Sequence, residues 1–343
     1  MRLALITGLA GERLTEGERR FLAEARPLGL IIFARNCVSH DQIRRLIADA
    51  KSAIGHDDTL VLIDQEGGRV QRLRPPLGRS LPPAAAYARL YETDPETAIV
   101  AAASAARLVA YDLAALGINA NCAPVLDVPV MGAHDIIGDR AYGAAPVPIA
   151  ALGGAVADGL LAGGVLPIMK HIPGHGRAMA DSHLELPVVS TPRKDLDATD
   201  FESFRLLQDL PAAMTAHVVY SDIDPDRPAS QSAIVTRDII RGAIGFDGLL
   251  MSDDLGMKAL AGPMRDRAAL VVAAGSDVAL HCSGDLTEMV NAAAGVPGLS
   301  GKAMARADAC FQLIEKSEPF DVGAAEAMLA AVIASHTRQP ESV

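Results

Sequence analysis

The chain has 343 residues, half of them apolar, and a formal net charge of −11. This length suits one large barrel or two ordinary domains, and the apolar content excludes a disordered chain. The sequence contains no block of basic residues, so nucleic acid is not an expected partner.

The expected compartment follows from three features of the sequence. Residues 1–14 lack a basic flank, a long apolar core and a cleavage site, so they predict a strand and not a signal peptide. The most apolar helical stretch, 99–117, is interrupted by Arg107 and Asp112, so no membrane span is expected. The four cysteines lie far apart without CxxC spacing, which is typical of inert thiols in a reducing compartment. We therefore expect a cytoplasmic protein with no membrane partner.

Short apolar runs alternate with longer amphipathic segments along the chain. The apolar runs predict strands at 2–8, 29–33, 60–63, 120–123, 166–169, 212–215, 249–251 and 278–280. Helices are predicted between them at 16–25, 41–53, 95–115, 148–162, 195–208, 236–244 and 266–274. Strands that are apolar throughout favour parallel pairing with both faces covered.

Eight such strands separated by helices predict an α/β fold, a single (β/α)8 TIM-type barrel. A doubly wound open sheet is the alternative, but the turn after the first strand reads GLAGER and lacks the GxGxxG pattern. Extra helices at 301–316 and 322–335 are expected to complete the barrel. The expected organisation is therefore one catalytic domain over 1–335 and a frayed tail over 336–343.

Polar residues follow nearly every predicted strand. They stand at 35–36, 64–66, 127, 170–171, 217, 253–254 and 281. In a parallel barrel these strand ends meet at one rim, the C-terminal face, where barrel enzymes keep their chemistry. Seven ends rich in titratable groups therefore predict a catalytic rim. The scarcity of aromatic residues, 3% with no tryptophan, favours a small polar pocket over a long sugar-binding groove.

The segment KHIPGHG at 170–176, followed by DSH at 181–183, is the first candidate for chemistry. Its proline and glycines exclude a helix, so it is a turn at a strand end. Lys170 and His171 can donate hydrogen bonds to hydroxyl groups in a pocket. Asp181 and His183 are two residues apart, which puts both side chains on one side of an extended segment. A carboxylate beside an imidazole favours its protonated form and makes a usable general acid.

A metal site is the rival interpretation of the same segment. His171, His175 and His183 lie close in sequence and could join an acid around a metal ion. The HxxxH spacing binds zinc well on a helix, and Pro173 excludes a helix here. We therefore expect no metal and no cofactor. A third interpretation is that these histidines are simply hydrogen-bonded within a loop.

The segment GFDGLLMSDDLGM at 245–257 brings two adjacent acids to the rim. Adjacent side chains cannot both point into one pocket, so one of Asp253 and Asp254 should face a substrate. The other should bind the loop or cap the next helix. An ionised aspartate at the rim can attack an anomeric carbon. The alternative is that both acids act as caps.

Two further segments carry charged residues. DQEGGRVQR at 64–72 contains Asp64 and Arg72, and IGDRAYG at 137–143 contains Arg140. Acids and arginines around a tight turn suit the recognition of sugar hydroxyl groups. They could equally form an ion-pair network that holds the loop, and Arg140 taken alone is more typical of a structural residue.

Together these segments resemble family 3 glycoside hydrolases, specifically the short bacterial β-N-acetylglucosaminidases of peptidoglycan recycling. The resemblance extends over about residues 28 to 283. The matching segments are DQEGGRVQR at 64–72, APVLDV at 123–128, IGDRAYG at 137–143, KHIPGHG at 170–176, DSH at 181–183, MTAHVVYSDID at 214–224 and GFDGLLMSDDLGM at 245–257. The departures are small: Ile172 stands where phenylalanine is common, and Gly256 where serine is common.

The resemblance implies a role for each matching residue. Asp253 matches the nucleophile, His183 the acid/base, and Asp181 the carboxylate partner of that histidine. The residues that match those holding the terminal N-acetylglucosamine are Asp64, Arg72, Arg140, Lys170 and His171. The DSH segment stands where longer family members, mostly β-glucosidases, use a glutamate from elsewhere.

The implied reaction is double displacement with retention, by an exo-acting enzyme. The implied substrate is N-acetylglucosamine β-1,4-linked to 1,6-anhydro-N-acetylmuramic acid, with or without peptide. Three alternatives remain at this point: a β-glucosidase of the same family, a metal-dependent barrel hydrolase, and a sugar-binding barrel without catalysis. Because an uncharged imidazole repels an anion less than a carboxylate does, phosphate is a possible acceptor besides water.

Overall fold

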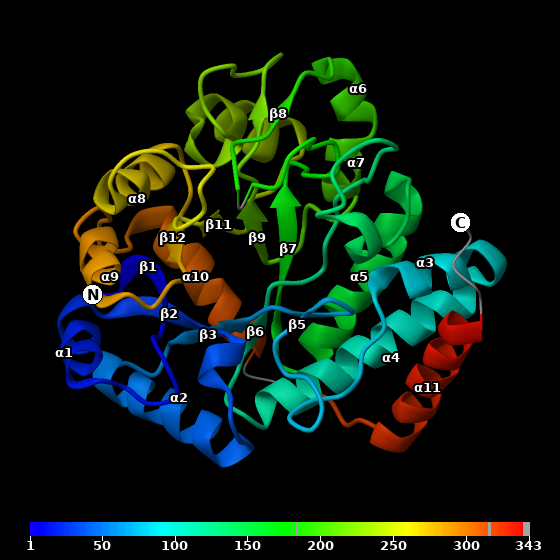
Figure 1. The fold of residues 1–343 in the computed structure, drawn as a ribbon, viewed down its shortest axis with the longest axis horizontal. Coiled ribbons are helices and arrows are strands. Elements are labelled where there is room, and N and C mark those ends of the chain that lie inside the picture. The colour runs from blue at the N-terminus through cyan, green and yellow to red at the C-terminus, as the bar shows by residue number, and fades with distance from the viewer. Residues whose placement is uncertain (183, 315–316, 339–343) are drawn as a thin grey trace.

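Eight parallel strands close into a barrel, and helices surround it (Figure 1). The structure, a computed structural model, describes residues 1–182, 184–314 and 317–338. In order around the barrel the strands are β1 (Leu3–Gly8), β12 (Val278–His281), β11 (Leu249–Asp254), β9 (Ala212–Thr215), β7 (Leu166–Ile172), β6 (Ala120–Asn121), β3 (Leu60–Ile63) and β2 (Pro27–Ile32). Each matches one of the eight predicted apolar runs, so the predicted (β/α)8 fold is confirmed.

The helices lie between the strands in sequence. They are α1 (Glu16–Ala25), α2 (His40–Ile54), α3 (Ala84–Thr93), α4 (Pro95–Ala114), α5 (Pro146–Ala162), α6 (Arg193–Ala198), α7 (Asp200–Arg205), a π-helix (Val235–Ala243), α8 (Met264–Ala273), α9 (Leu286–Ala293), α10 (Gly301–Ile314) and α11 (Val322–Arg338). The sequence prediction had no helix at α3. It had one continuous helix over 195–208, where the structure has α6 and α7.

The break between α6 and α7 lies at Thr199. Its backbone leaves the helical region, with φ −129° and ψ −81°. Its hydroxyl group donates to the carbonyl oxygen of Asp195 at 2.6 Å. Serine and threonine side chains that bond to nearby backbone compete with helix continuation, which explains the break. At the C-terminus, α11 continues through Arg338 into the segment predicted as a tail, and residues 339–343 lie outside the described residues.

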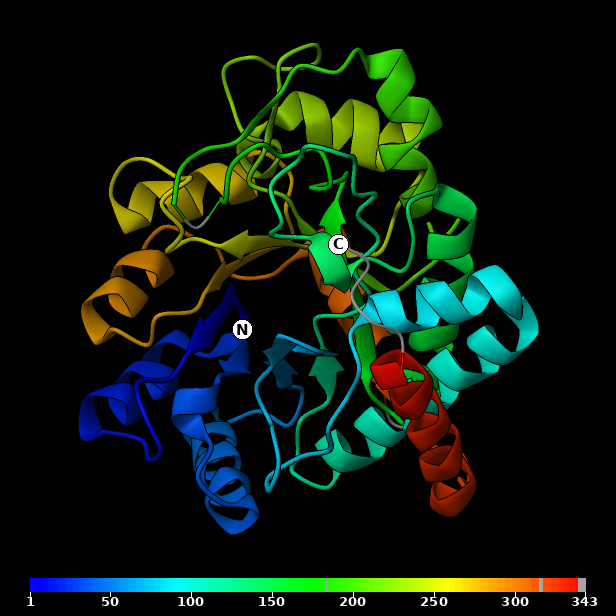
Figure 2. The ribbon, with the colours of Figure 1, turned by 45° about the vertical axis from the view of Figure 1, so that its right-hand side comes forward.

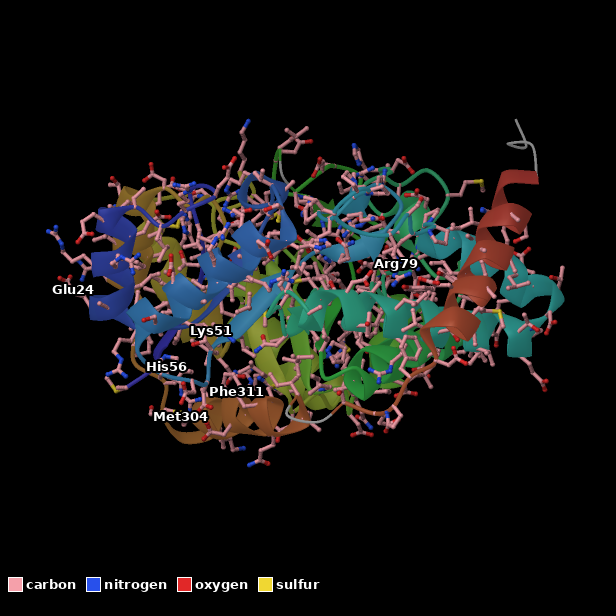
Figure 3. The ribbon with its side chains drawn as sticks, turned by 90° about the horizontal axis from the view of Figure 1, so that it is seen from below. Glu24, Lys51, His56, Arg79, Met304 and Phe311 are labelled. Atoms are coloured by element: carbon pink, nitrogen blue, oxygen red, sulfur yellow. The ribbon has the colours of Figure 1, made fainter. Side chains whose placement is uncertain are left out.

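Two apolar layers hold the barrel together. One fills the space between the strands and the outer helices, and the other fills the barrel interior. The interior layer includes Leu28, Leu166 and Val278 from the strands and Cys310 and Phe311 from α10. Figure 3 shows Met304 and Phe311 on α10, at the lower edge of the molecule in that view. Helix α10 therefore closes the N-terminal end of the barrel.

Helix α4 is long and apolar enough to span a membrane by length and composition alone. Over half of its most apolar window, 56%, is buried inside the fold. Helices α5 and α11 pack against it, and Figure 2 shows α11 lying beside α3 and α4. This burial explains its apolar composition as that of a core helix.

A short hairpin stands on the rim directly after β3. It consists of β4 (Gln65–Gly67) and β5 (Val70–Gln71), which pair antiparallel. Gly67 has φ +114°, and a Cβ atom there would lie 2.4 Å from the carbonyl oxygen of Pro82. Glycine adopts a positive φ readily and has no Cβ atom to clash with Pro82, which accounts for Gly67 in this turn. A second small pair, β8 (Val188–Val189) with β10 (Val219–Tyr220), lies outside the barrel.

Candidate active site

A pocket of about 510 Å³ opens at the C-terminal ends of the strands. Its volume is in the range of pockets that bind small molecules. The residues that line it come from segments far apart in the sequence: Ile31, Phe33, Arg35, Asp64, Glu66, Arg69, Val70, Arg72, Ile136, Arg140, Lys170, His171, Met214, Asp253, Asp254, Met257, Leu280, Cys282 and Ser283. Four of the seven predicted strand ends therefore line the pocket, those at 35–36, 64–66, 170–171 and 253–254, whereas Asp127, His217 and His281 are not among the lining residues.

Lys170 lies between two carboxylates at the base of the pocket. Its Nζ is 2.9 Å from Oδ1 of Asp64 and 2.7 Å from Oε1 of Glu66. Although burial alone would lower the pKa of this ammonium group, the two carboxylates more than offset it and raise the pKa. Lys170 is therefore a fixed positive charge, and its two partners are held as anions.

Two arginines complete the ion network. Arg72 donates from Nη2 to Oδ2 of Asp64 at 2.8 Å. Arg140 binds both oxygens of Glu66, with distances of 2.9 and 2.8 Å. Burial would raise the pKa of Glu66, but Arg140 and Lys170 lower it to about 2. The same competition holds the pKa of Asp64 well below its usual range. This network holds the charged side chains at the pocket surface in fixed positions, so they need not rearrange when a ligand binds.

Asp253 lies across the pocket at the end of β11. Its Oδ1 accepts a hydrogen bond from the backbone N–H of Asp254 at 2.8 Å. Burial alone would raise the pKa of Asp253, but the rings of His171 and His217 outweigh burial and lower it. Asp253 is therefore ionised at neutral pH. Among the described residues, no lysine or arginine forms an ion pair with it, in contrast to Asp64 and Glu66.

Asp254 has a different surrounding, although it also borders the pocket. Its Oδ1 accepts hydrogen bonds from the backbone N–H groups of Gly256 at 3.0 Å and Cys282 at 2.9 Å. These bonds join the end of β11 to the segment after β12. The two adjacent acids thus differ as the sequence suggested: Asp254 holds the loop, and Asp253 leaves its second oxygen available.

The turn after β7 is fixed by Asp127, which is fully buried. Its Oδ1 accepts from the backbone N–H groups of His171 at 3.2 Å and His175 at 2.7 Å. Its Oδ2 lies 2.7 Å from Nδ1 of His171. This last contact assigns the proton to Nδ1, which leaves Nε2 of His171 free to bind in the pocket when the ring is neutral. The sequence placed Asp127 on the rim but gave it no role.

The segment that contains Asp181 and His183 starts beside this turn. Nε2 of His175 is 2.9 Å from the hydroxyl oxygen of Ser182, and the carbonyl oxygen of Ser182 accepts from the N–H of Ala259 at 3.2 Å. Asp181 is not among the described residues that line the pocket. Its carbonyl oxygen accepts from the N–H of Leu184 at 2.8 Å. The predicted acid/base, His183, lies outside the described residues.

Within residues 1–182, 184–314 and 317–338, no group of three or more histidine, cysteine or acidic side chains is placed to hold a metal ion. His171 and His175, two members of the rival metal site, lie with their ring centres 5.6 Å apart. One nitrogen of each ring is bound, that of His171 to Asp127 and that of His175 to Ser182.

Glu66 was placed on the predicted rim but was not singled out as a site residue from the sequence. It stands two positions after Asp64 at the start of an extended hairpin, and such spacing puts two side chains on the same side. That signal was present in the sequence. The bidentate contact between Glu66 and Arg140, 74 positions apart, needed the tertiary structure.

A closed parallel barrel with a polar pocket at its C-terminal rim is the architecture of the TIM-barrel enzymes. Within that class the chain belongs to family 3 of the glycosyl hydrolases, because residues 3–314 match the N-terminal domain of that family. It is therefore a glycoside hydrolase.

Known relatives resemble the chain over most of its length. The β-hexosaminidase of Alkalilimnicola ehrlichii is 41% identical over 81% of this chain and 80% of its own. That of Methylococcus capsulatus is 40% identical over 80% and 81%. The crystal structure of NagZ from Neisseria gonorrhoeae in complex with N-trifluoroacetyl-D-glucosamine is 32% identical, covers 97% of this chain and 98% of its own, and has a TM-score of 0.86.

Proposed function

We propose that the protein is a retaining exo-β-N-acetylglucosaminidase in which Asp253 is the nucleophile. The observation that carries this proposal is the state of Asp253: an ionised carboxylate in the pocket, without a lysine or arginine partner among the described residues. Its Oδ1 is held by the Asp254 N–H, so the other oxygen can attack an anomeric carbon. The β-hexosaminidases among its relatives support the sugar class.

The proposed reaction has two steps. Asp253 attacks C1 while His183, supported by Asp181, protonates the leaving oxygen, and a glycosyl-aspartate forms. The neutral imidazole then takes a proton from water, which attacks C1 and releases the sugar with its β configuration retained. The role of His183 rests on the resemblance of the DSH segment. The hydrogen bonds of Ser182 with His175 and Ala259 support this role. They hold Ser182, the residue before His183, next to the turn that carries His171.

Five residues are proposed to bind the terminal sugar: Asp64, Arg72, Arg140, Lys170 and His171. The ion network fixes the positions of the first four, and Nε2 of His171 is free to contact a hydroxyl group. The proposed substrate is N-acetylglucosamine β-1,4-linked to 1,6-anhydro-N-acetylmuramic acid, with or without peptide, in cytoplasmic cell-wall recycling. The related structure that holds an N-acetylglucosamine analogue supports the sugar, and the four free cysteines agree with a reducing compartment.

Turnover of p-nitrophenyl N-acetyl-β-glucosaminide and of the matching β-glucoside tests the sugar class. We expect a strong preference for the acetamido sugar, and equal or greater turnover of the glucoside would move the enzyme to the β-glucosidase branch. The proposed disaccharide, with and without peptide, is then tested by mass spectrometry of its products. Adding phosphate to the same assay tests the alternative acceptor, since phosphorolysis would yield a sugar 1-phosphate.

Asp253→Ala tests the nucleophile. The variant should lose turnover of the acetamido substrate, and added azide should restore release of nitrophenol. The azide product should have the α configuration, because one displacement replaces two. Asp254→Ala is the neighbouring control. Full activity in Asp253→Ala would show that the nucleophile assignment is wrong.

A further inference from the structure

Arg79 connects the C-terminal helix α11 to the hairpin on the catalytic rim. Helix α11 starts at Val322, beyond residue 314 where the family match ends. It packs against α3 and α4 on the outside of the barrel (Figure 2). Arg79 lies in the loop after the β4–β5 hairpin, and Figure 3 labels it near α4 and α11.

The guanidinium group of Arg79 binds an acid on each of two helices. Its Nε and Nη2 contact the carboxylate of Asp112 on α4 at 2.8 and 3.2 Å. Its Nη1 donates to Oε1 of Glu326 on α11. The three contacts use three nitrogen atoms of the planar group and set its orientation, with Asp112 partly buried and Glu326 half-exposed.

The backbone of Arg79 supports the hairpin that carries the sugar-binding residues. Its carbonyl oxygen accepts from Nε2 of Gln71 on β5 at 2.5 Å. The same Nε2 donates to the carbonyl oxygen of Leu73 at 2.7 Å. Between these two residues stands Arg72, whose Nη2 holds Asp64 at 2.8 Å. The contacts therefore run without a gap from α11 to the ion pair of Asp64 with Arg72.

The hairpin has a second support in Gln65, whose Oε1 accepts from the backbone N–H groups of Arg72 and Leu73 at 3.0 Å each. Nε of Arg72 is buried without a hydrogen-bond partner, so Arg72 is held at one end of its guanidinium group and by contact with the ring of Phe33. The orientation of the Arg72 guanidinium group therefore depends on how well the hairpin backbone is held, both by Gln65 and by the contact from Arg79.

We propose that Arg79 is a positioning residue for sugar binding. Its bonds to Asp112 and Glu326 fix its own backbone, the backbone fixes Gln71, and the hairpin thereby keeps Arg72 and Asp64 in the geometry that the sugar requires. Sites of this kind need their residues held within about 0.5 Å, which neighbouring contacts must provide. This inference rests on the proposed function, since it assigns Asp64 and Arg72 to sugar binding.

The test compares KM and kcat on p-nitrophenyl N-acetyl-β-glucosaminide for Arg79→Ala, Glu326→Gln and the control Val332→Ala. Val332 is buried on α11, six positions after Glu326, so its variant loosens the helix without removing a member of the network. We expect Arg79→Ala to raise KM about three- to tenfold with kcat nearly unchanged, the size of other long-range couplings. Glu326→Gln should raise KM less, and Val332→Ala should lower Tm without raising KM.

A double variant tests the route through Arg72. In an Arg72→Ala background, Arg79→Ala should have no further effect on KM, because the residue on which it acts is gone. A KM for Arg79→Ala equal to that of the wild type would overturn the proposal. So would an equal rise in KM with and without Arg72, or an equal rise in Val332→Ala. If Arg79→Ala does not fold, Glu326→Gln carries the comparison.

Hydrogen exchange gives a readout that does not depend on the substrate. Exchange at residues 65–73 should rise in Arg79→Ala and Glu326→Gln and stay at the wild-type level in Val332→Ala. Unchanged exchange in both variants would overturn the proposal even if the wild type turned over no acetamido sugar. Failure of the wild type on that sugar, together with the expected exchange pattern, would instead count against the proposed function alone.

Discussion

Lys170 is the side chain on which the charge balance of the pocket depends. It is almost completely buried, and its ammonium group forms ion pairs with the carboxylates of both Asp64 and Glu66. Removing one partner from a buried ion pair leaves a charge without compensation and is strongly destabilising. The ion network therefore contributes to stability as well as to the proposed sugar binding.

Lys170→Met should lower the free energy of unfolding by about 3 kcal/mol, the low end of the range for breaking a buried ion pair. The low end applies because Arg72 and Arg140 still face the two carboxylates. Urea unfolding at pH 7 measures the change. The exposed Lys258→Met is the matched control and should change stability by less than about 0.5 kcal/mol. Equal stability of the two variants would contradict this prediction.

His175 makes the stability of the protein depend on pH. Burial, with a contribution from His171, lowers the pKa of His175 to about 4. In the unfolded chain a histidine has a pKa of about 6.5, so below that pH the unfolded state binds a proton that the folded state does not. The contribution of His175 to stability is therefore complete above pH 6.5 and is lost as the pH falls to about 4.

The expected loss from His175 is roughly 3 kcal/mol between pH 6.5 and pH 4. His175→Gln keeps a polar group near Ser182 and cannot titrate, so its stability should fall less over this interval than that of the wild type. Urea unfolding at pH 7.0, 5.5 and 4.5 measures both slopes. Parallel slopes for the two proteins would show that His175 does not titrate as described.

At the scale of the elements, helix α10 allows stability to be changed without changing activity, because it lies at the end of the barrel opposite the pocket. Phe311 packs into the barrel interior from the end opposite the pocket, with 8% of its surface exposed. Leu313, two positions along the same helix, is 46% exposed. The two positions therefore offer a buried and an exposed truncation on one element.

Phe311→Ala should destabilise the fold by about 3–5 kcal/mol, because it removes a buried ring and leaves a cavity. At 25 °C the folded variant should keep wild-type KM and kcat, since the pocket lies at the other end of the strands. Leu313→Ala should leave both stability and activity nearly unchanged. Thermal unfolding and initial rates check these outcomes, and a rise in KM for Phe311→Ala would contradict the separation of the two ends.

The strands were predictable because each is a short run of apolar residues bounded by polar ones. Continuous apolar runs indicate strands buried on both faces, and eight of them leave few architectures besides the barrel. Helix α3 was missed although its residues, AAAYARLYET, include many good helix formers; its packing against α4 shows which side is buried. The break at Thr199 was missed because it depends on a local side-chain bond.

At the scale of the whole molecule, the barrel is open to substrate at one end. Helix α10 fills the N-terminal end, and the pocket opens at the C-terminal rim with Asp64 and Lys170 near its base. Because the barrel interior is packed, substrate can reach the site only from the rim. The proposed exo cleavage requires that the pocket admit the sugar terminus alone, and product analysis tests this.

A chitin tetramer should lose one N-acetylglucosamine at a time, so trimer and monomer appear first. Mass spectrometry of early time points measures the products. A retained acetamido group on every fragment and no dimer before the trimer accumulates are the expected results. Dimer as the dominant first product would contradict an exo-acting pocket. Asp253→Ala serves as the inactive control.

The sequence by itself determined the barrel, the rim on which the polar residues meet, and the family. Those features depend on local patterns: apolar runs, polar strand ends, and motifs such as KHIPGHG and SDDL. Only the tertiary structure decided which charges meet. Three contacts depend on it: Glu66 with Arg140, Asp127 with His171, and Arg79 with Glu326. Their positions in the sequence do not predict these pairs, because barrel closure and helix packing bring them together.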